Sequence, residues 1–167
     1  MIKICLEAWD KYSGELEAWY RSLSVEDLNS LSYKGITTKV FGMVSRYMEE
    51  DGKVVIDKLD LYNIVEIDNG DYQGTLLYLV PFDTYQPNEH EYLMTYIGYG
   101  SCSCCDTLQG LELCGDYTEN EYENTIKGHM TLARDILSHI IRPYNTGWRN
   151  DERFDTVTLN KEENEND

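Results

Sequence analysis

Hydrophobic positions in the first fifty residues recur every three or four places, which is the spacing of an amphipathic helix. The Ser13-Gly14 pair lies inside the first of these runs and predicts a break between two helices. Ser24 opens the motif SVED, which is typical of a capped helix start, and a short helix is expected from there through Leu31. A third helix is expected from Thr38 to Glu50.

The central part of the chain changes to a period of two, which indicates β-strands. Strands are expected at 61–67, 74–80 and 91–99, and Asn69-Gly70 between the first two is a strong hairpin signal. Three such strands predict an antiparallel meander. Side chains of the third strand alternate between two rows that both contain tyrosine, and one row is expected to pack under a later helix.

The last third returns to helical spacing. Thr118 and Glu121 match a capping box, an apolar stripe runs from Ile126 to Ile141, and Pro143 is expected to stop the helix. The resulting fold class is α+β: N-terminal helices, a three-stranded antiparallel meander and a long C-terminal helix packed on the sheet. Residues 1–160 are expected to form a single domain, and 161–167 a disordered acidic tail.

The net charge of −17 is concentrated in the centre of the chain. From Leu59 to Ile126 there is no Lys or Arg, but there are 13 Asp and Glu residues. Such a region repels nucleic acids and anionic membranes and attracts cations or basic proteins. Direct nucleic-acid binding is therefore not expected, and a basic protein is the favoured kind of partner.

No apolar run approaches the roughly 18 residues of a membrane span, and the N-terminus lacks the basic and apolar segments of a signal peptide. A cytoplasmic location without membrane partners is expected. The five cysteines are then expected to be reduced thiols or metal ligands rather than a disulfide framework.

The stretch YGSCSCCDTLQG at 99–110 is the main candidate for a chemical site, at the end of the third strand and before a short helix expected at 107–113. Its exposed backbone N–H groups are suited to bind a ligand, and a cysteine near a helix start has a lowered pKa. The candidate ligand loop consists of Gly100, Ser101, Ser103 and Asp106. Nearby carboxylates argue against a phosphate, and a tight turn built from small residues is the favoured interpretation.

Zinc is the alternative cofactor at this loop. Its candidate ligands are Cys102, Cys104, Cys105 and Cys114. The spacing lacks the paired knuckles of common zinc sites, and two adjacent cysteines are poorly placed to bind one ion. A cysteine nucleophile would need a histidine base, but no pattern places His90, His129 or His139 beside the loop. No catalytic residues are identified, and enzymatic activity stays an open alternative that the sequence does not favour.

Carboxylates also gather around the predicted hairpin turn, at Glu66, Asp68 and Asp71. They could bind calcium or magnesium, but the spacing does not match a twelve-residue calcium loop, so a solvated turn is favoured. Nine of the 14 tyrosines lie in the region without Lys or Arg. Tyrosines beside carboxylates suit a protein interface. The candidate partner-binding residues are Asp68, Asp71, Tyr72, Asp83, Tyr85, Glu89 and Glu91.

The segment 67–110, which contains GDYQGTLL, TYQP and YGSCSCCDTL, resembles a family of small, uncharacterised, acidic proteins encoded by phages. The motif PYNTGW at 143–148 is similar to the closing motif of that family. Cys104 stands where the family often has a glycine, which argues against all three loop cysteines being ligands. The resemblance implies a phage setting and no particular chemistry.

Two functions follow as hypotheses. The first is an interaction or inhibitor protein that binds a basic surface of a host protein, such as a nucleic-acid-binding defence factor, inside the infected cell. The second is a metal- or thiol-dependent site at the cysteine loop, or sequestration of a small ligand there with GDYQG and TYQP lining the pocket.

Overall fold

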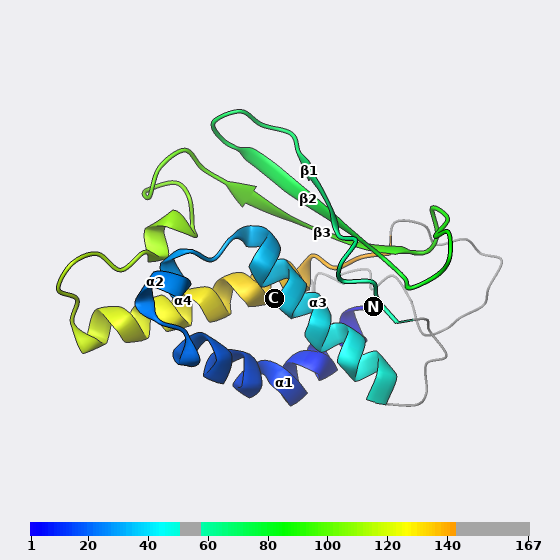
Figure 1. The fold of residues 1–167 in the computed structure, drawn as a ribbon, viewed down its shortest axis with the longest axis horizontal. Coiled ribbons are helices and arrows are strands. Elements are labelled where there is room, and N and C mark those ends of the chain that lie inside the picture. Colours follow the sequence, from blue (N-terminus) through cyan, green and yellow to red (C-terminus); the bar gives the residue numbers. More distant parts are fainter. Residues whose placement is uncertain (51–57, 143–167) are drawn as a thin grey trace, which may run out of the picture.

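A computed structural model describes residues 1–50 and 58–142 of the chain. The predicted motif at 143–148 and the predicted tail at 161–167 lie outside the described residues. Within them the fold is α+β, as expected: a helical layer packs against one face of a three-stranded antiparallel sheet (Figure 1). None of the described helices combines the length and apolar character that a membrane crossing requires.

The N-terminal half consists of helices α1 (Ile2–Ser22), α2 (Val25–Asn29) and α3 (Tyr33–Glu50). The predicted break at Ser13-Gly14 is wrong, because α1 continues through it. Buried Tyr12 and Leu16 anchor the helix on either side of Gly14, and this packing outweighs the cost of about 1 kcal/mol for a glycine in a helix. The predicted cap at Ser24 is confirmed, since its side chain accepts a hydrogen bond from Asp27 N.

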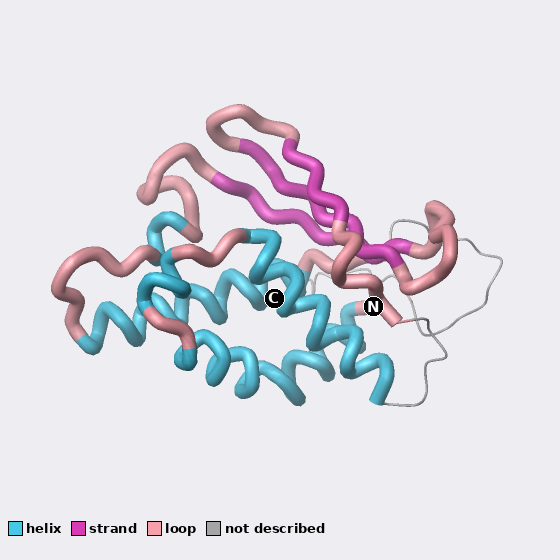
Figure 2. Tube along the Cα trace, in the orientation of Figure 1, coloured by secondary structure: helices cyan, strands magenta, loops and turns pink. Residues whose placement is uncertain are grey.

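The sheet consists of β1 (Val65–Asp68), β2 (Gly74–Pro81) and β3 (Tyr92–Tyr99), in the order β1-β2-β3. The expected meander and its hairpin are confirmed, with Asp68 opposite Leu76 and Gly74 opposite Tyr99 (Figure 2). One row of β3, formed by Leu93, Thr95 and Ile97, faces the helices and is buried. The other row carries Tyr96, which is exposed.

The last helix, α4 (Glu119–Ser138), begins with the predicted capping box of Thr118 and Glu121. It contacts α1, α3 and β3. Thr95 Oγ1 donates a hydrogen bond of 2.7 Å to the carbonyl of Ile136, which ties the sheet to this helix. The helix expected at 107–113 is only a single 3-10 turn, η1 (Gln109–Leu111).

The four α-helices share one hydrophobic core with β2 and β3, whereas all four residues of β1 are exposed. The largest fully buried side chains include Tyr20, Phe41, Tyr78, Leu93 and Ile136. At the hairpin end, the strands project away from the helical layer (Figure 1). The start of α3 and the loop after β3 flank this projecting end.

Candidate functional site

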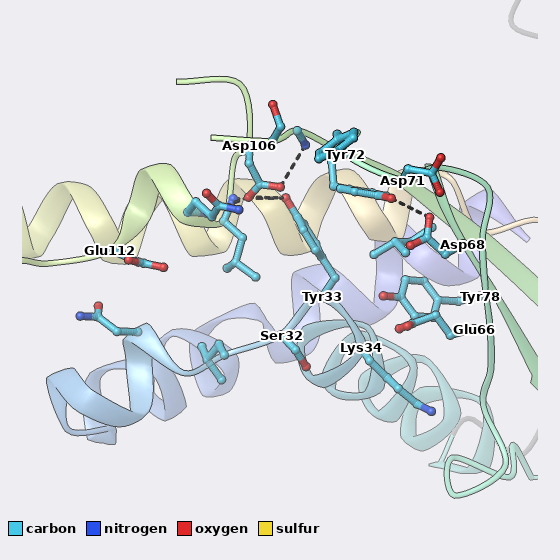
Figure 3. A pocket seen from close by; sticks show the side chains of 18 residues that line it. Ser32, Tyr33, Lys34, Glu66, Asp68, Asp71, Tyr72, Tyr78, Asp106 and Glu112 are labelled. Atoms are coloured by element: carbon cyan, nitrogen blue, oxygen red, sulfur yellow. Dashed lines mark hydrogen bonds between the residues drawn. The ribbon is translucent and has the colours of Figure 1, made fainter. Parts of the chain in front are cut away.

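A cavity of about 560 Å³ lies under the projecting end of the sheet. Its walls come from the β1–β2 hairpin, the junction of α2 and α3, and the loop at 99–112 (Figure 3). We call it the hairpin pocket. The side chains that give it its chemical character are Tyr33, Lys34, Glu66, Asp68, Asp71, Tyr72, Tyr78, Tyr99, Asp106 and Glu112. The pocket thus combines five carboxylates and four tyrosines with a single ammonium group.

Strand register explains why carboxylates enter this pocket. Glu66 lies opposite Tyr78, and Asp68 lies opposite Leu76, so these β1 side chains share the inner face of the sheet with the core residues of β2. Farther along the sheet the helices cover this face. Here the strands rise away from the helices, and the two carboxylates remain exposed.

Asp106 holds the loop that closes the pocket. It is only 4% exposed, and its carboxylate accepts hydrogen bonds from Tyr33 Oη at 3.2 Å, Gly100 N at 3.1 Å and Gln109 N at 2.8 Å. These donors come from α3 and from both sides of the loop. Asp106, expected as a ligand residue, is therefore occupied by the protein's own donors.

Two tyrosines of the pocket are tied to carboxylates. Tyr99 Oη donates a hydrogen bond of 2.7 Å to Asp68, and this carboxylate raises the pKa of Tyr99 to about 12. Burial is the main reason why the pKa of Tyr33 is raised to about 12, with the charge of Asp106 adding to the effect. Both phenols therefore stay neutral at physiological pH, and each presents an aromatic ring beside a negative charge.

Tyr78 is the least expected member of the pocket. The residue is fully buried, yet it lines the cavity, and its hydroxyl has no hydrogen-bond partner among the described residues. Burial raises the pKa of Tyr78, and the nearby carboxylate of Glu66, its cross-strand neighbour, adds to the rise. A buried hydroxyl without a partner is costly. It offers an unused hydrogen-bonding group to an occupant of the pocket.

The structure divides the predicted partner-binding residues into two groups. Asp68, Asp71 and Tyr72 line the hairpin pocket. The others, Asp83, Tyr85, Glu89 and Glu91, lie in the β2–β3 connection at the opposite end of β2. The eight residues of β2 separate the groups by about 23 Å. A small contact surface at the pocket would therefore include only the first group.

The cysteines are also divided. Cys102 and Cys105 bring their sulfur atoms to 2.9 Å, whereas neither Cys104 nor Cys114 makes a sulfur contact of this kind. Within residues 1–50 and 58–142, no three His, Cys, Asp or Glu side chains are arranged to hold a metal ion. The four cysteines proposed as zinc ligands do not converge, and neither do Glu66, Asp68 and Asp71 for calcium. All four of these cysteines are exposed.

Small residues are needed in this loop for a steric reason. A Cβ atom on Gly100 would lie 2.4 Å from the carbonyl carbon and oxygen of Cys105, and one on Gly110 would lie 2.9 Å from the carbonyl oxygen of Ser103. The interpretation of the loop as a tight turn is therefore supported. Of the candidate ligand-loop residues, Gly100, Ser101 and Asp106 line the hairpin pocket. Ser103 does not.

Histidines do not assist these thiols. His129, in the middle of α4, is 2% exposed. Its Nδ1 forms a hydrogen bond with the carbonyl of Thr125, and its ring packs edge-on against the ring of Tyr20. None of the hydrogen bonds of the described cysteine sulfurs involves a histidine.

Sequence reasoning missed Tyr33, Tyr78, Tyr99 and Glu112 as pocket residues, because the start of α3, the strand pairing and the loop after β3 bring them to the cavity only in the folded chain. It also missed the pairing of Cys102 with Cys105. The signal was present, since these two cysteines form a C-x-x-C motif.

Comparisons with known proteins return no match to a family model, a curated protein or a solved structure. The resemblance to phage-encoded proteins therefore remains a prediction from the sequence.

Proposed function

We propose that this protein binds a basic protein, and that the hairpin pocket receives a lysine or arginine side chain of that partner. The observation that carries the proposal is the meeting of five carboxylates and four tyrosines in one cavity. Carboxylates accept hydrogen bonds from ammonium and guanidinium groups, and tyrosine rings attract cations. A basic host protein of an infected cell, as the sequence suggests, is the expected partner.

The charges of the pocket are not neutralised from elsewhere in the described chain. Most Lys and Arg ion pairs join residues of the N-terminal helices to one another, as in Arg46 with Glu15 and Glu50. Among the described residues, only one acid between Leu59 and Ile126 pairs with Lys or Arg: Glu123, which binds Arg21. Lys34 lines the pocket but forms no ion pair with any described residue. The pocket therefore keeps a negative potential that favours a cation.

A peptide titration tests this proposal. Binding of a short arginine-rich peptide is measured by calorimetry at two salt concentrations, with an acidic peptide of equal length as the negative control. The double variant Asp68→Asn, Asp71→Asn keeps one side-chain oxygen at each position but removes two charges. At about 0.3–1 kcal/mol for each exposed ion pair, it should weaken binding by about 3- to 30-fold.

The matched control removes the same charge at the other end of β2. The variant Asp83→Asn, Glu89→Gln should bind almost as tightly as the wild type, because these side chains lie in the β2–β3 connection, away from the pocket. Equal weakening by both variants would mean that only net charge attracts the peptide. Binding that is indifferent to salt would contradict an electrostatic contact. The same variants can then be used as baits at two salt concentrations to capture the partner from host lysate.

The unpartnered hydroxyl of Tyr78 favours a second candidate, the sequestration of a small organic cation. A polyamine that enters fully could use this hydroxyl, whereas a side chain from a protein need not reach it. The substitution Tyr78→Phe distinguishes the two candidates, because it should weaken polyamine binding and leave peptide binding nearly unchanged.

A further inference from the structure

Cys102 and Cys105 lie on one tight turn between Ser101 and Asp106, two residues that line the hairpin pocket. The carbonyl of Cys102 accepts hydrogen bonds from Cys105 N at 2.9 Å and from Asp106 N at 2.7 Å, so the backbone closes as in a single helical turn. This places both side chains on one side of the turn, with their sulfur atoms 2.9 Å apart. A disulfide bond of about 2.05 Å requires a further approach of less than about 1 Å.

The surroundings of the pair favour reaction at Cys105. Both cysteines are exposed, so reagents reach them from solvent. The pKa of Cys105 is lowered, chiefly by its hydrogen bond with Cys102 and further by the hydroxyl of Ser101, whose Oγ lies 3.8 Å from its sulfur. A lower pKa increases the fraction of thiolate, which is the reactive form. Gly100 keeps the space beside this sulfur open, since a Cβ there would lie 2.7 Å from it.

We propose that Cys102 and Cys105 form a redox-active dithiol that is converted to an intramolecular disulfide by small-molecule disulfides. The thiolate of Cys105 attacks one sulfur of the reagent, forms a mixed disulfide and releases one thiol. The thiol of Cys102 then loses its proton and attacks the Cys105 sulfur, which releases the second thiol. Two protein thiols are oxidised and one reagent disulfide is reduced to two thiols, so atoms and electrons balance.

The location of the pair predicts which disulfides react best. The loop belongs to the region without Lys or Arg, and the carboxylates of the hairpin pocket lie next to it. A cationic disulfide such as cystamine should therefore react faster than the anionic oxidised glutathione, and added salt should reduce the difference. This dithiol does not depend on the proposed binding function, because it needs no protein partner.

Intact-mass spectrometry of the full chain tests the proposal. Fully reduced protein is incubated with cystamine near neutral pH, and the mass is followed with time. The expected product has lost two hydrogen atoms from Cys102 and Cys105 and carries no adduct on either of them, whereas the exposed Cys104 and Cys114 can each take up one adduct. Dithiothreitol restores the starting mass. Cleavage before Asp106 separates the three loop cysteines from Cys114, so a bond within the loop is distinguished from a bond to Cys114.

Serine variants identify the two partners. Cys104→Ser and Cys114→Ser are matched controls that remove exposed thiols without a sulfur partner, and they should form the disulfide as fast as the wild type. Cys102→Ser should accumulate a stable adduct on Cys105, and Cys105→Ser should form no intramolecular bond. Cys5 is buried, and this burial raises its pKa to about 12. It should therefore stay unmodified in every folded variant. Mixed disulfides that persist on Cys102 or Cys105 in the wild type, or a bond that is lost in Cys104→Ser, would overturn the assignment.

Discussion

The buried carboxylate of Asp106 offers the sharpest test of how this fold holds its pocket. Three donors converge on it: the hydroxyl of Tyr33 and the backbone N–H groups of Gly100 and Gln109. Replacing it with alanine leaves both N–H groups without their acceptor. Each buried, unsatisfied polar group costs about 1–3 kcal/mol, and water entering at the loop offsets part of this cost. We therefore expect Asp106→Ala to lower the free energy of unfolding by about 2–4 kcal/mol.

Urea unfolding followed by circular dichroism measures this loss, and amide hydrogen exchange locates it. The N–H of Gln109 should exchange faster in Asp106→Ala than in the wild type, while amides in the middle of α4 should change only as much as global stability does. Asp106→Asn keeps one acceptor oxygen and should lose less. Asp116→Ala is the matched control, because this exposed carboxylate has no hydrogen-bond partner in the described part of the chain. It should change stability by less than about 0.5 kcal/mol.

Two results would refute this reasoning. If Asp106→Ala unfolds within about 0.5 kcal/mol of the wild type, the three hydrogen bonds do not hold the loop. If stability falls but the exchange of Gln109 is unchanged relative to the rest of the protein, the loss arises outside the loop. Either result would remove the structural basis for a preformed hairpin pocket.

Two further predictions concern α4. Thr118→Ala removes the side-chain acceptor of the capping box and should cost about 1 kcal/mol in urea unfolding, whereas Thr131→Ala on the exposed side of the same helix should cost less. Burial lowers the pKa of His129 in the folded state, so the unfolded chain takes up a proton first as the pH falls. Stability should therefore be fully retained above about pH 7 and decline as the pH falls below about 6.5, and His129→Phe should reduce this decline. An identical pH dependence of unfolding in His129→Phe and the wild type would contradict the assignment to this residue.

Local signals in the sequence determined most of the secondary structure. Ser24 and the Thr118–Glu121 pair mark helix starts through contacts between residues three apart. Asn69 marks the hairpin through its side chain, which accepts a hydrogen bond from Thr75 N across the connection. Such signals act within a few residues, so they can be recognised without the fold. The break expected at Ser13-Gly14 failed for the opposite reason, because the packing of α1 against distant helices decides whether a glycine interrupts it.

The site was only partly accessible to the sequence. Its concentration of acids and tyrosines in the central region was evident, but which of them share a cavity was not. Asp68 and Asp71 line the same cavity as Gly100 and Asp106, because β3 pairs with β2 and ends beside the hairpin. Glu89 lies in the β2–β3 connection, at the other end of β2.

The sequence by itself determined the classes of element, their order and the excess of negative charge, because these depend on neighbouring residues and on composition. Only the tertiary structure decided that Tyr33, 73 residues from Asp106, holds the carboxylate at the pocket wall, and that Tyr78 lies buried with its hydroxyl unpaired. Contacts of this kind arise when strand register and helix packing bring distant segments together. Their energies depend on burial, which no short stretch of the chain specifies.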